Sequence, residues 1–295
     1  MPATWRARSS YRGQWRPGTR VIALITGRAD AARIAAALRP LPVRFVSTTG
    51  ELRAAVDELH PSCAGLILEA HDARGESTSP FIIAMIRAGA RIPILGYTSA
   101  GPAHADDIRD FAHAGVHELV FREVDDSPAL LTAKISRGEE ACAAAEVFAR
   151  IAAHTPVRLR GMIDYVLNYP RQDHSVTSVA SALGIHRRTL VNWCERAKVP
   201  PPATVITWSR LLLAAELLQV PGRPVERVAN SLEFASAAAF RNLCQRYLGR
   251  RPSTLREPGA LDESYAAYAN AMTSALRGGP PQDASVQPFR SVGDL

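Results

Sequence analysis

The chain of 295 residues lacks any uninterrupted apolar run near the roughly 20 residues that a membrane-spanning helix needs. Its opening segment, MPATWRARSSYRGQWRPGTR, lacks the apolar centre of a secretory signal peptide. The four cysteines, Cys63, Cys142, Cys194 and Cys244, are scattered and form no C-x-x-C pair. We therefore expect reduced, mostly buried thiols, no metal site, no membrane partner and a cytoplasmic location.

Signatures of catalysis are also missing. The segment 26–30, TGRAD, follows the first apolar run but lacks the glycine spacing of a phosphate-binding loop. No nucleophile stands beside a candidate base. The sequence therefore predicts no enzyme and no cofactor, and binding of a nucleotide cofactor is the observation that would reverse this interpretation.

Positive charge is unevenly distributed along the chain, whose formal net charge is +7. Residues 155–257 hold fifteen basic and seven acidic side chains, a net charge of +8. Residues 1–20 hold five arginines and no acid, whereas residues 21–138 carry −2. A basic excess confined to particular segments is the footprint that binding to nucleic-acid phosphates requires.

The segment 20–138 alternates short apolar runs with helical patterns. Helices are expected at 29–38, 51–59, 80–87, 103–114 and from 129 onward. Strands are expected at 21–26, 43–47, 65–70, 92–97 and 118–121. Five strands alternating with helices predict an α/β domain whose parallel sheet is covered on both faces.

The segment 236–248 reads as one amphipathic helix. Its apolar residues share one stripe, formed by Phe240, Leu243, Cys244, Tyr247 and Leu248. Polar residues occupy the opposite side, and Gly249 ends the helix. A packed back and a polar, basic front suit a DNA major groove. On spacing alone, an ordinary amphipathic helix with a solvated basic face explains the pattern equally well.

The same stretch resembles the second helix-turn-helix of AraC/XylS-type transcription regulators. The residues that carry the resemblance are Ala229, Phe234, Phe240, Cys244, Gly249 and Pro252. Upstream, 176–197 resembles the first helix-turn-helix, 208–218 the joining helix and 157–170 the leading helix. The resemblance implies an all-α DNA-binding domain at 155–257 with two helix-turn-helix motifs. It also implies double-stranded DNA as a partner, recognition helices in successive major grooves, and activation through RNA polymerase.

The resemblance also indicates which residues face DNA. The first groove is assigned to Arg187, Arg188, Thr189, Asn192 and Arg196. The second groove is assigned to Ser236, Ala237, Ala238, Arg241, Asn242 and Gln245. Phosphates, which position a protein without reading sequence, are assigned to Arg246, Arg250 and Arg251.

Two positions depart from the family pattern. Glu233 stands where the family usually has glycine before the second turn. If the backbone there needs a positive φ, a non-glycine residue costs about 1 kcal/mol. Asn192 stands where the first recognition helix often carries arginine, so we expect a different base preference, since asparagine pairs with adenine and arginine with guanine.

The order and size of residues 20–138 resemble the receiver domain of two-component response regulators, which implies a flavodoxin-like fold. The family's acidic Mg²⁺-binding pair is replaced by Ile25 and Thr26, and its phosphoacceptor aspartate by Glu69. The fourth strand retains Thr98, and Arg122 stands where the family has lysine. Without the acidic pair little remains to hold Mg²⁺ for phosphoryl transfer. We therefore expect a degenerate, unphosphorylated receiver with Glu69, Thr98 and Arg122 as its pocket.

Two questions about this pocket stay open at the level of sequence. Glu69 is either ion-paired with Arg122, imitating a fixed state, or solvated at a strand end. Asp30 and Asp72 lie near the same edge and are considered as metal ligands from shifted positions, although a metal site is not expected.

The remaining segments are assigned by composition. Residues 1–19 read as a disordered basic tail, 139–154 as a connector helix or a continuation of the preceding one, and 258–295 as a flexible tail with a small helix near 264–276. The apolar strip of 142–151 is either a dimer seam, hence a possible homodimer, or packs on the chain's own domains.

The three residues of the triplet Leu211–Leu213 are not all expected to face one core. At least one of Leu212 and Leu213 is assigned to a contact with the receiver-like domain, a second subunit or polymerase. The alternative is that all three leucines belong to a broad buried face within the DNA-binding domain.

The sequence thus predicts a sequence-specific DNA-binding regulator controlled by a receiver-like domain. Two alternatives remain open. In one, the N-terminal domain senses a small ligand near Glu69, Thr98 and Arg122. In the other, the protein modulates another regulator as a protein-interaction module without binding DNA, which Glu233 and the alanines of the second recognition helix favour.

Overall fold

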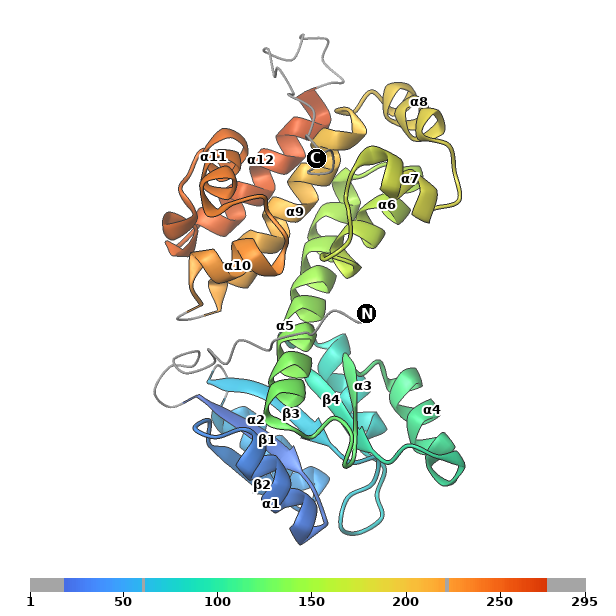
Figure 1. The fold of residues 1–295 in the computed structure, drawn as a ribbon, viewed down its shortest axis with the longest axis vertical. Coiled ribbons are helices and arrows are strands. Elements are labelled where there is room, and N and C mark those ends of the chain that lie inside the picture. Colours follow the sequence, from blue (N-terminus) through green and yellow to red (C-terminus); the bar gives the residue numbers. More distant parts are fainter. Residues whose placement is uncertain (1–18, 60–61, 221–222, 275–295) are drawn as a thin grey trace, which may run out of the picture.

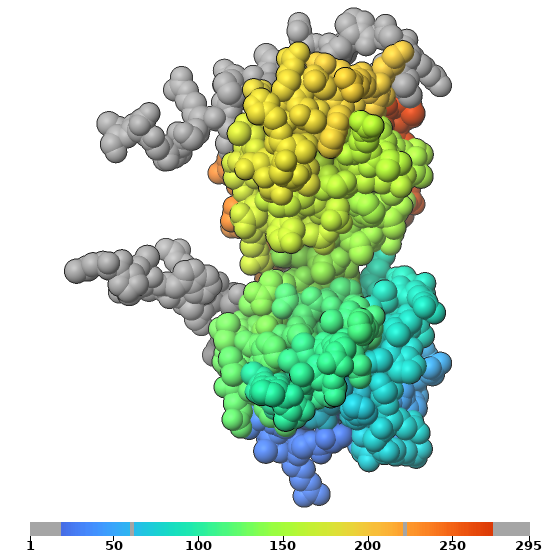
Figure 2. All heavy atoms as spheres, turned by 90° about the vertical axis from the view of Figure 1, so that its right-hand side faces the viewer, coloured from blue at the N-terminus to red at the C-terminus, as the bar shows by residue number. Residues whose placement is uncertain are grey.

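The computed structural model describes residues 19–59, 62–220 and 223–274, arranged as two lobes along its long axis (Figure 1). The lower, α/β lobe and the upper, helical lobe are joined by one long helix, α5 (Pro128–Ile151). Figure 2 shows the two lobes stacked in the perpendicular view. The predicted basic tail, apart from its last residue, and the segment 275–295 lie outside the described residues.

The α/β lobe contains a five-stranded parallel sheet with the order β2-β1-β3-β4-β5. The strands are β1 (Arg20–Leu24), β2 (Val43–Val46), β3 (Cys63–Leu68), β4 (Ile94–Thr98) and β5 (Glu118–Phe121). This order defines a flavodoxin-like sheet. The predicted fold is confirmed, and the strand bounds differ from the expected ones by at most two residues, with β5 matching at both ends.

Helices cover both faces of this sheet, as its continuous apolar strands require. They are α1 (Arg28–Ala37), α2 (Thr49–Leu59), α3 (Ser79–Arg87), the short 3₁₀ helix η1 (Pro102–His104), α4 (Ala105–Ala114) and the first half of α5. One core contains Leu52, Phe81 and Phe111 from α2, α3 and α4. The opposite core contains Ile34 from α1 and Leu131 from α5. The sheet is therefore sandwiched between three helices and two.

Helix α5 runs without a break from one lobe into the other. Leu131 packs in the sheet core, whereas Val147 and Ile151 belong to the core of the helical lobe. Gly138 sits where α5 crosses the start of β4, and a Cβ added there would lie 2.8 Å from the Cβ of Pro93. The segment 139–151 therefore continues the last helix of the α/β lobe. Its apolar strip packs within the chain, the second of the two interpretations above.

The helical lobe surrounds one central helix. Its elements are the 3₁₀ helix η2 (Ala152–His154), α6 (Val157–Asn168), α7 (Val176–Ala182), α8 (Arg187–Ala197), α9 (Pro202–Gln219), α10 (Val225–Ser231), α11 (Ala237–Leu248), η3 (Pro252–Arg256) and α12 (Ala260–Ser274). Helices α5, α6, α8, α10, α11 and α12 all contact α9. Within the described residues, none of the helices has both the length and the apolar character that crossing a bilayer requires.

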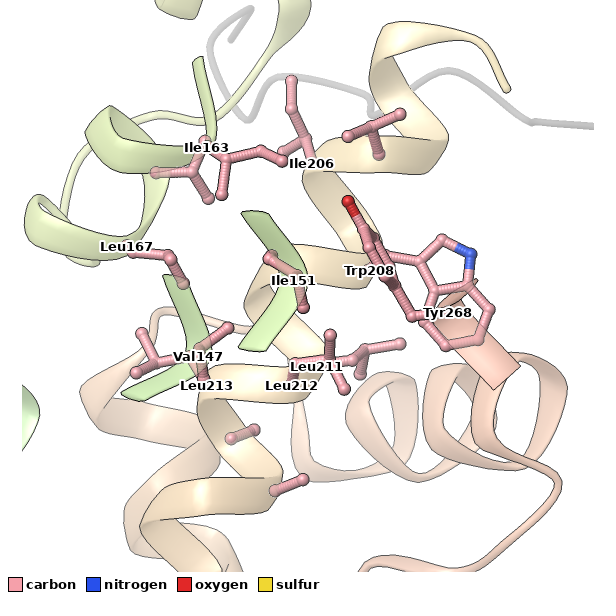
Figure 3. Packing of buried hydrophobic residues seen from close by; sticks show 14 of the residues in the cluster. Val147, Ile151, Ile163, Leu167, Ile206, Trp208, Leu211, Leu212, Leu213 and Tyr268 are labelled. Carbon is pink, nitrogen blue, oxygen red and sulfur yellow. The ribbon is translucent and has the colours of Figure 1, made fainter. Parts of the chain in front are cut away.

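The leucine triplet of α9 corrects one expectation. Leu211, Leu212 and Leu213 are all fully buried within one continuous core (Figure 3). The prediction that they could not share a core was wrong, because helices enclose α9 on every side. Val147 and Ile151 of α5 are part of this enclosure.

Helix α12 corrects part of a second expectation, which assigned 258–295 to a flexible tail with a small helix near 264–276. The helix is present, but it begins at Ala260 and packs against the lobe. Tyr265, Tyr268 and Met272 belong to the core of the helical lobe. The hydroxyls of Tyr268 and Thr155 lie 2.7 Å apart, which joins α12 to the segment before α6. The packed part of the chain therefore extends through α12, beyond the predicted boundary at residue 257.

Candidate nucleic-acid interface

The first helix-turn-helix is formed by α7 and α8, each with a side-chain cap at its start. The Ser175 hydroxyl accepts a hydrogen bond from the Ser178 amide at 3.1 Å. The His186 Nδ1 atom accepts one from the Arg188 amide at 3.2 Å. Gly184 takes φ +65° between the two helices. The two caps satisfy amide groups that a helix start leaves unpaired.

Helix α8 has a buried back and an exposed basic front. Leu190 and Cys194 are buried in the lobe's core. The front consists of the exposed Arg187, Arg188 and Arg196, with the half-buried Thr189 and Asn192 beside them. All five residues assigned to the first groove therefore have solvent access, and three cations stand on one helix.

The second helix-turn-helix, α10 and α11, repeats this construction. The Ser236 hydroxyl accepts a hydrogen bond from the Ala239 amide at 3.0 Å. Phe240, Cys244 and Leu248 form the buried back of α11, and the rings of Phe240 and Phe234 lie 4.7 Å apart. Gly249 ends the helix at φ +67°. The predicted stripe of the helix is therefore the face that packs.

The front of α11 is exposed and polar. The exposed residues assigned to DNA are Ser236, Ala238, Arg241, Asn242, Gln245, Arg246 and Arg251, and the partly buried ones are Ala237 and Arg250. Figure 1 shows α8 and α11 on opposite sides of α9 in the helical lobe. The structure thus presents two separate polar helix fronts on helices that share one core.

At the edge of the sheet, Glu69 forms the ion pair that was one of its two predicted states. Its Oε1 atom accepts a hydrogen bond from the Arg122 Nη2 atom at 2.9 Å. Its Oε2 atom accepts from both the amide and the hydroxyl of Thr26, each at 2.7 Å. The side chain is 12% exposed. Both carboxylate oxygens are therefore occupied at the position where a receiver carries its phosphoacceptor.

A network of charges surrounds this pair. The Arg122 Nε atom lies 3.2 Å from an oxygen of Asp30, which also pairs with Arg33. The Tyr97 hydroxyl lies 3.3 Å from Asp30, and burial raises the pKa of Tyr97 to about 12. Thr98 is not part of the network, because its hydroxyl donates to Asp107 at 3.2 Å. The structure brings Glu69 and Arg122 together and adds Asp30, but it directs Thr98 elsewhere.

Asp72 has a structural role in a loop. Its carboxylate accepts hydrogen bonds from the amides of Thr49 at 2.9 Å, Arg74 at 2.8 Å and Glu76 at 3.1 Å. Those bonds, led by the Thr49 amide, lower the pKa of Asp72. Within the described ranges, no three His, Cys, Asp or Glu side chains gather as a metal site would require. The carboxylates of Asp30 and Asp72 are instead engaged by arginine and by backbone amides.

Comparison with known proteins bears on the helical lobe. Residues 179–258 match a family model described as a helix-turn-helix domain. The chain carries a helix-turn-helix domain of the AraC type. The matched residues of this AraC-type domain run from within α7 to just beyond η3, so they include α8 and α11 and stop before α12.

Neither solved structures nor curated proteins add to the assignment of the α/β lobe. A crystal structure of full-length FixJ from B. japonicum is 14% identical, and the alignment covers 77% of this chain and 96% of that chain at a TM-score of 0.35. Similarity at that level carries no argument, so the flavodoxin-like assignment rests on the strand order. No curated protein matches the chain.

The AraC-type domain contains a strained position that the sequence indicated. Glu233 has φ +51°, the left-handed conformation in which glycine is favoured. The Arg210 Nη2 atom donates to the carbonyls of Leu232 at 2.6 Å and Glu233 at 3.2 Å. The guanidinium of Arg210 also lies 4.5 Å from the ring centre of Phe234. Arg210, which sequence reasoning missed, therefore holds the turn together from the joining helix.

Arg250, one of the assigned phosphate contacts, already has acidic partners within the protein. The Arg250 Nε atom lies 3.1 Å from Glu263 of α12, and its Nη1 atom lies 3.3 Å from Glu257. Arg251 is exposed and makes no ion pair within the part of the chain that the structure describes. Arg251 is therefore the better placed of the two to meet a phosphate. Gln245 is also engaged, since its amide donates to the Gly249 carbonyl at 3.2 Å.

Proposed function

We propose that the chain is a transcription regulator that binds double-stranded DNA sequence-specifically, with α8 and α11 in successive major grooves. The observation that carries this proposal is the repeated construction of the two helices. Each begins at a side-chain cap, buries an apolar back in a common core and exposes arginine and amide side chains on its front. Two polar fronts of this kind suit two consecutive major-groove segments, which lie about 34 Å apart.

The front residues divide by the chemistry they offer. Arginine recognises guanine with two hydrogen bonds and asparagine recognises adenine in the same way. We therefore assign base reading to Asn192 on α8 and to Arg241 and Asn242 on α11. Ala237 and Ala238 supply apolar contact, for example to a thymine methyl group. The other exposed arginines assigned to DNA contact its phosphates or enter its grooves. They are Arg187, Arg188, Arg196, Arg246 and Arg251.

We further propose that the α/β lobe regulates the helical lobe without being phosphorylated in the usual way. The saturated carboxylate of Glu69 supports this proposal, because Arg122 and Thr26 occupy both of its oxygens. The absence of acids at Ile25 and Thr26 supports it as well. Contact with RNA polymerase and homodimerisation follow from the family resemblance alone, and no contact within the described residues bears on them.

The experiment that tests DNA binding is a salt titration with the full-length chain. DNA fragments are selected from a random pool, and the affinity for the best fragment is measured between 50 and 200 mM salt, where about six phosphate contacts should weaken binding by about 10³-fold. The matched variants are Arg188→Ala on α8 and Arg109→Ala on the exposed side of α4. Only Arg188→Ala should weaken binding and reduce the salt slope, by about one unit. Selection of no fragment, or an affinity that salt leaves unchanged, would overturn the proposed function.

A further inference from the structure

Helix α5 carries two adjacent glutamates at the point where it leaves one lobe and enters the other. Glu139 and Glu140 are 8% and 9% exposed. They follow Gly138, whose missing side chain lets α5 approach Pro93. Buried carboxylates are costly unless they are paired, so their partners indicate why they are there.

The two glutamates pair with arginines from different helix-turn-helix units. Glu139 pairs with Arg223, which stands directly ahead of α10 in the second unit. Both of these side chains are almost fully buried, at 7% and 10% exposure. Glu140 pairs with Arg171, whose Nη2 atom lies 3.0 and 3.1 Å from the two carboxylate oxygens. Arg171 lies in the loop that leads from α6 into α7, the start of the first unit.

Neighbouring contacts strengthen the same junction. The Arg227 Nη2 atom of α10 lies 3.5 Å from the Ser136 hydroxyl of α5. The Arg91 Nη1 atom, from the loop before β4, lies 3.0 Å from Glu216 of α9, and its Nη2 atom lies 2.6 Å from Glu146 of α5. In Figure 1, α5 enters the helical lobe between α10 on one side and α6 and α7 on the other. Each helix-turn-helix unit is therefore fastened separately to one helix that begins in the α/β lobe.

We propose that Glu139 and Glu140 are positioning residues that hold the two recognition helices at one separation and thereby set the spacing between the DNA segments they bind. This inference rests on the proposed function, because it concerns how the two helix fronts share one DNA. Adjacent side chains on a helix point about 100° apart, so one short stretch of α5 can hold two units on different sides. A change in the packing of α5 on the sheet would then move both units together.

The test measures DNA-spacing preference with the full-length chain. The two segments of the selected DNA are separated or brought closer one base pair at a time around the roughly 10 base pairs of a helical turn. The variants are Glu139→Gln and Glu140→Gln. The matched control is Glu118→Gln, which loses ion pairs to Arg137 and Lys134 that lie entirely within the α/β lobe.

We expect the wild type and Glu118→Gln to prefer one spacing by about tenfold over spacings one base pair away, the size of a single poor contact. Glu139→Gln and Glu140→Gln should reduce that preference to about threefold or less, while affinity for a single isolated segment stays the same. A merely structural role would lower stability without changing the spacing preference.

Because Glu139 is almost fully buried and its variant risks failing to fold, Glu140→Gln decides the question. The reversed pair Glu140→Arg with Arg171→Glu should restore the narrow preference. A folded Glu140→Gln with the wild-type preference, or a folded reversed pair as broad as Glu140→Gln, would overturn the inference alone. If the wild type selects no DNA at all, the proposed function fails and the inference fails with it.

Discussion

Replacing Glu233 with glycine should stabilise the protein. Glu233 is exposed and holds φ +51°, a conformation that costs a residue with a side chain about 1 kcal/mol and costs glycine little. The exposed carboxylate attracts Arg210, and the loss of that attraction offsets at most about 0.5 kcal/mol. We therefore expect a net gain in the free energy of unfolding of about 0.5–1 kcal/mol.

Two other substitutions separate the backbone effect from the charge. Glu233→Ala removes the same carboxylate but keeps a Cβ, so it should give no gain. Glu226→Gly makes the same exchange in the first turn of α10, where φ is helical, and should destabilise by about 1 kcal/mol. Opposite signs for one exchange at two nearby positions would be difficult to explain by anything except backbone conformation.

The assay is urea unfolding followed by far-ultraviolet circular dichroism, together with thermal unfolding. A gain of about 1 kcal/mol should raise Tm by about 2–4 °C for a cooperative unit of this size. Equal stabilisation by Glu233→Ala and Glu233→Gly would refute the reasoning, because removal of charge would then explain the whole effect.

Three further predictions concern the rest of the molecule. Arg122→Ala should lower the free energy of unfolding by about 2 kcal/mol, because Glu69 keeps a buried charge without its cation, whereas the exposed Arg109→Ala should change it by less than about 0.5 kcal/mol. Incubation with acetyl phosphate and Mg²⁺ should add no phosphoryl mass to the intact protein, and mass spectrometry that detects a phosphorylated acidic side chain would contradict the interpretation of Glu69. Burial, followed by the nearby Arg210, lowers the pKa of His174 from its ordinary 6.5 to about 4, so the unfolded chain binds this proton first as the pH falls. The stabilising contribution is therefore present above about pH 6.5 and is lost between pH 6.5 and 4; His174→Gln should flatten that part of a pH–stability curve, and an unchanged slope would show that other groups cause it.

Much of this architecture was predictable because short apolar runs and helix ends are local properties. The five strands and the buried back of α11 depend on neighbouring residues alone. The positive φ at Glu233 was indicated by the glycine that the family usually has there. These elements were confirmed with bounds that differ by only a few residues.

The errors came from long-range packing. The three leucines Leu211–Leu213 were not expected to share one core, because the sequence does not show how many helices surround α9. The small helix expected near 264–276 was placed in a flexible tail because the residues after Glu257 are rich in Pro, Gly, Ala and Ser, although Tyr265 and Tyr268 of α12 complete the same core.

The same limit applies to the candidate sites. The pairing of Arg250 with Glu263 joins residues from different elements, and the orientation of Thr98 toward Asp107 depends on how α4 packs. Neither contact leaves a pattern in the sequence. The glutamates Glu139 and Glu140 were visible as charges in an apolar helix, but their partners were not predictable, because Arg171 and Arg223 lie in distant loops.

The measurement that tests the central claim most directly is base preference at each half of the selected DNA, for the wild type, Asn192→Ala and Arg241→Ala. If α8 and α11 read separate major-groove segments, each variant should relax the preference at a different segment by about 1–3 kcal/mol and leave the other segment unchanged. If instead no fragment is preferred and both variants behave like the wild type, the two helices do not read DNA and the account is contradicted.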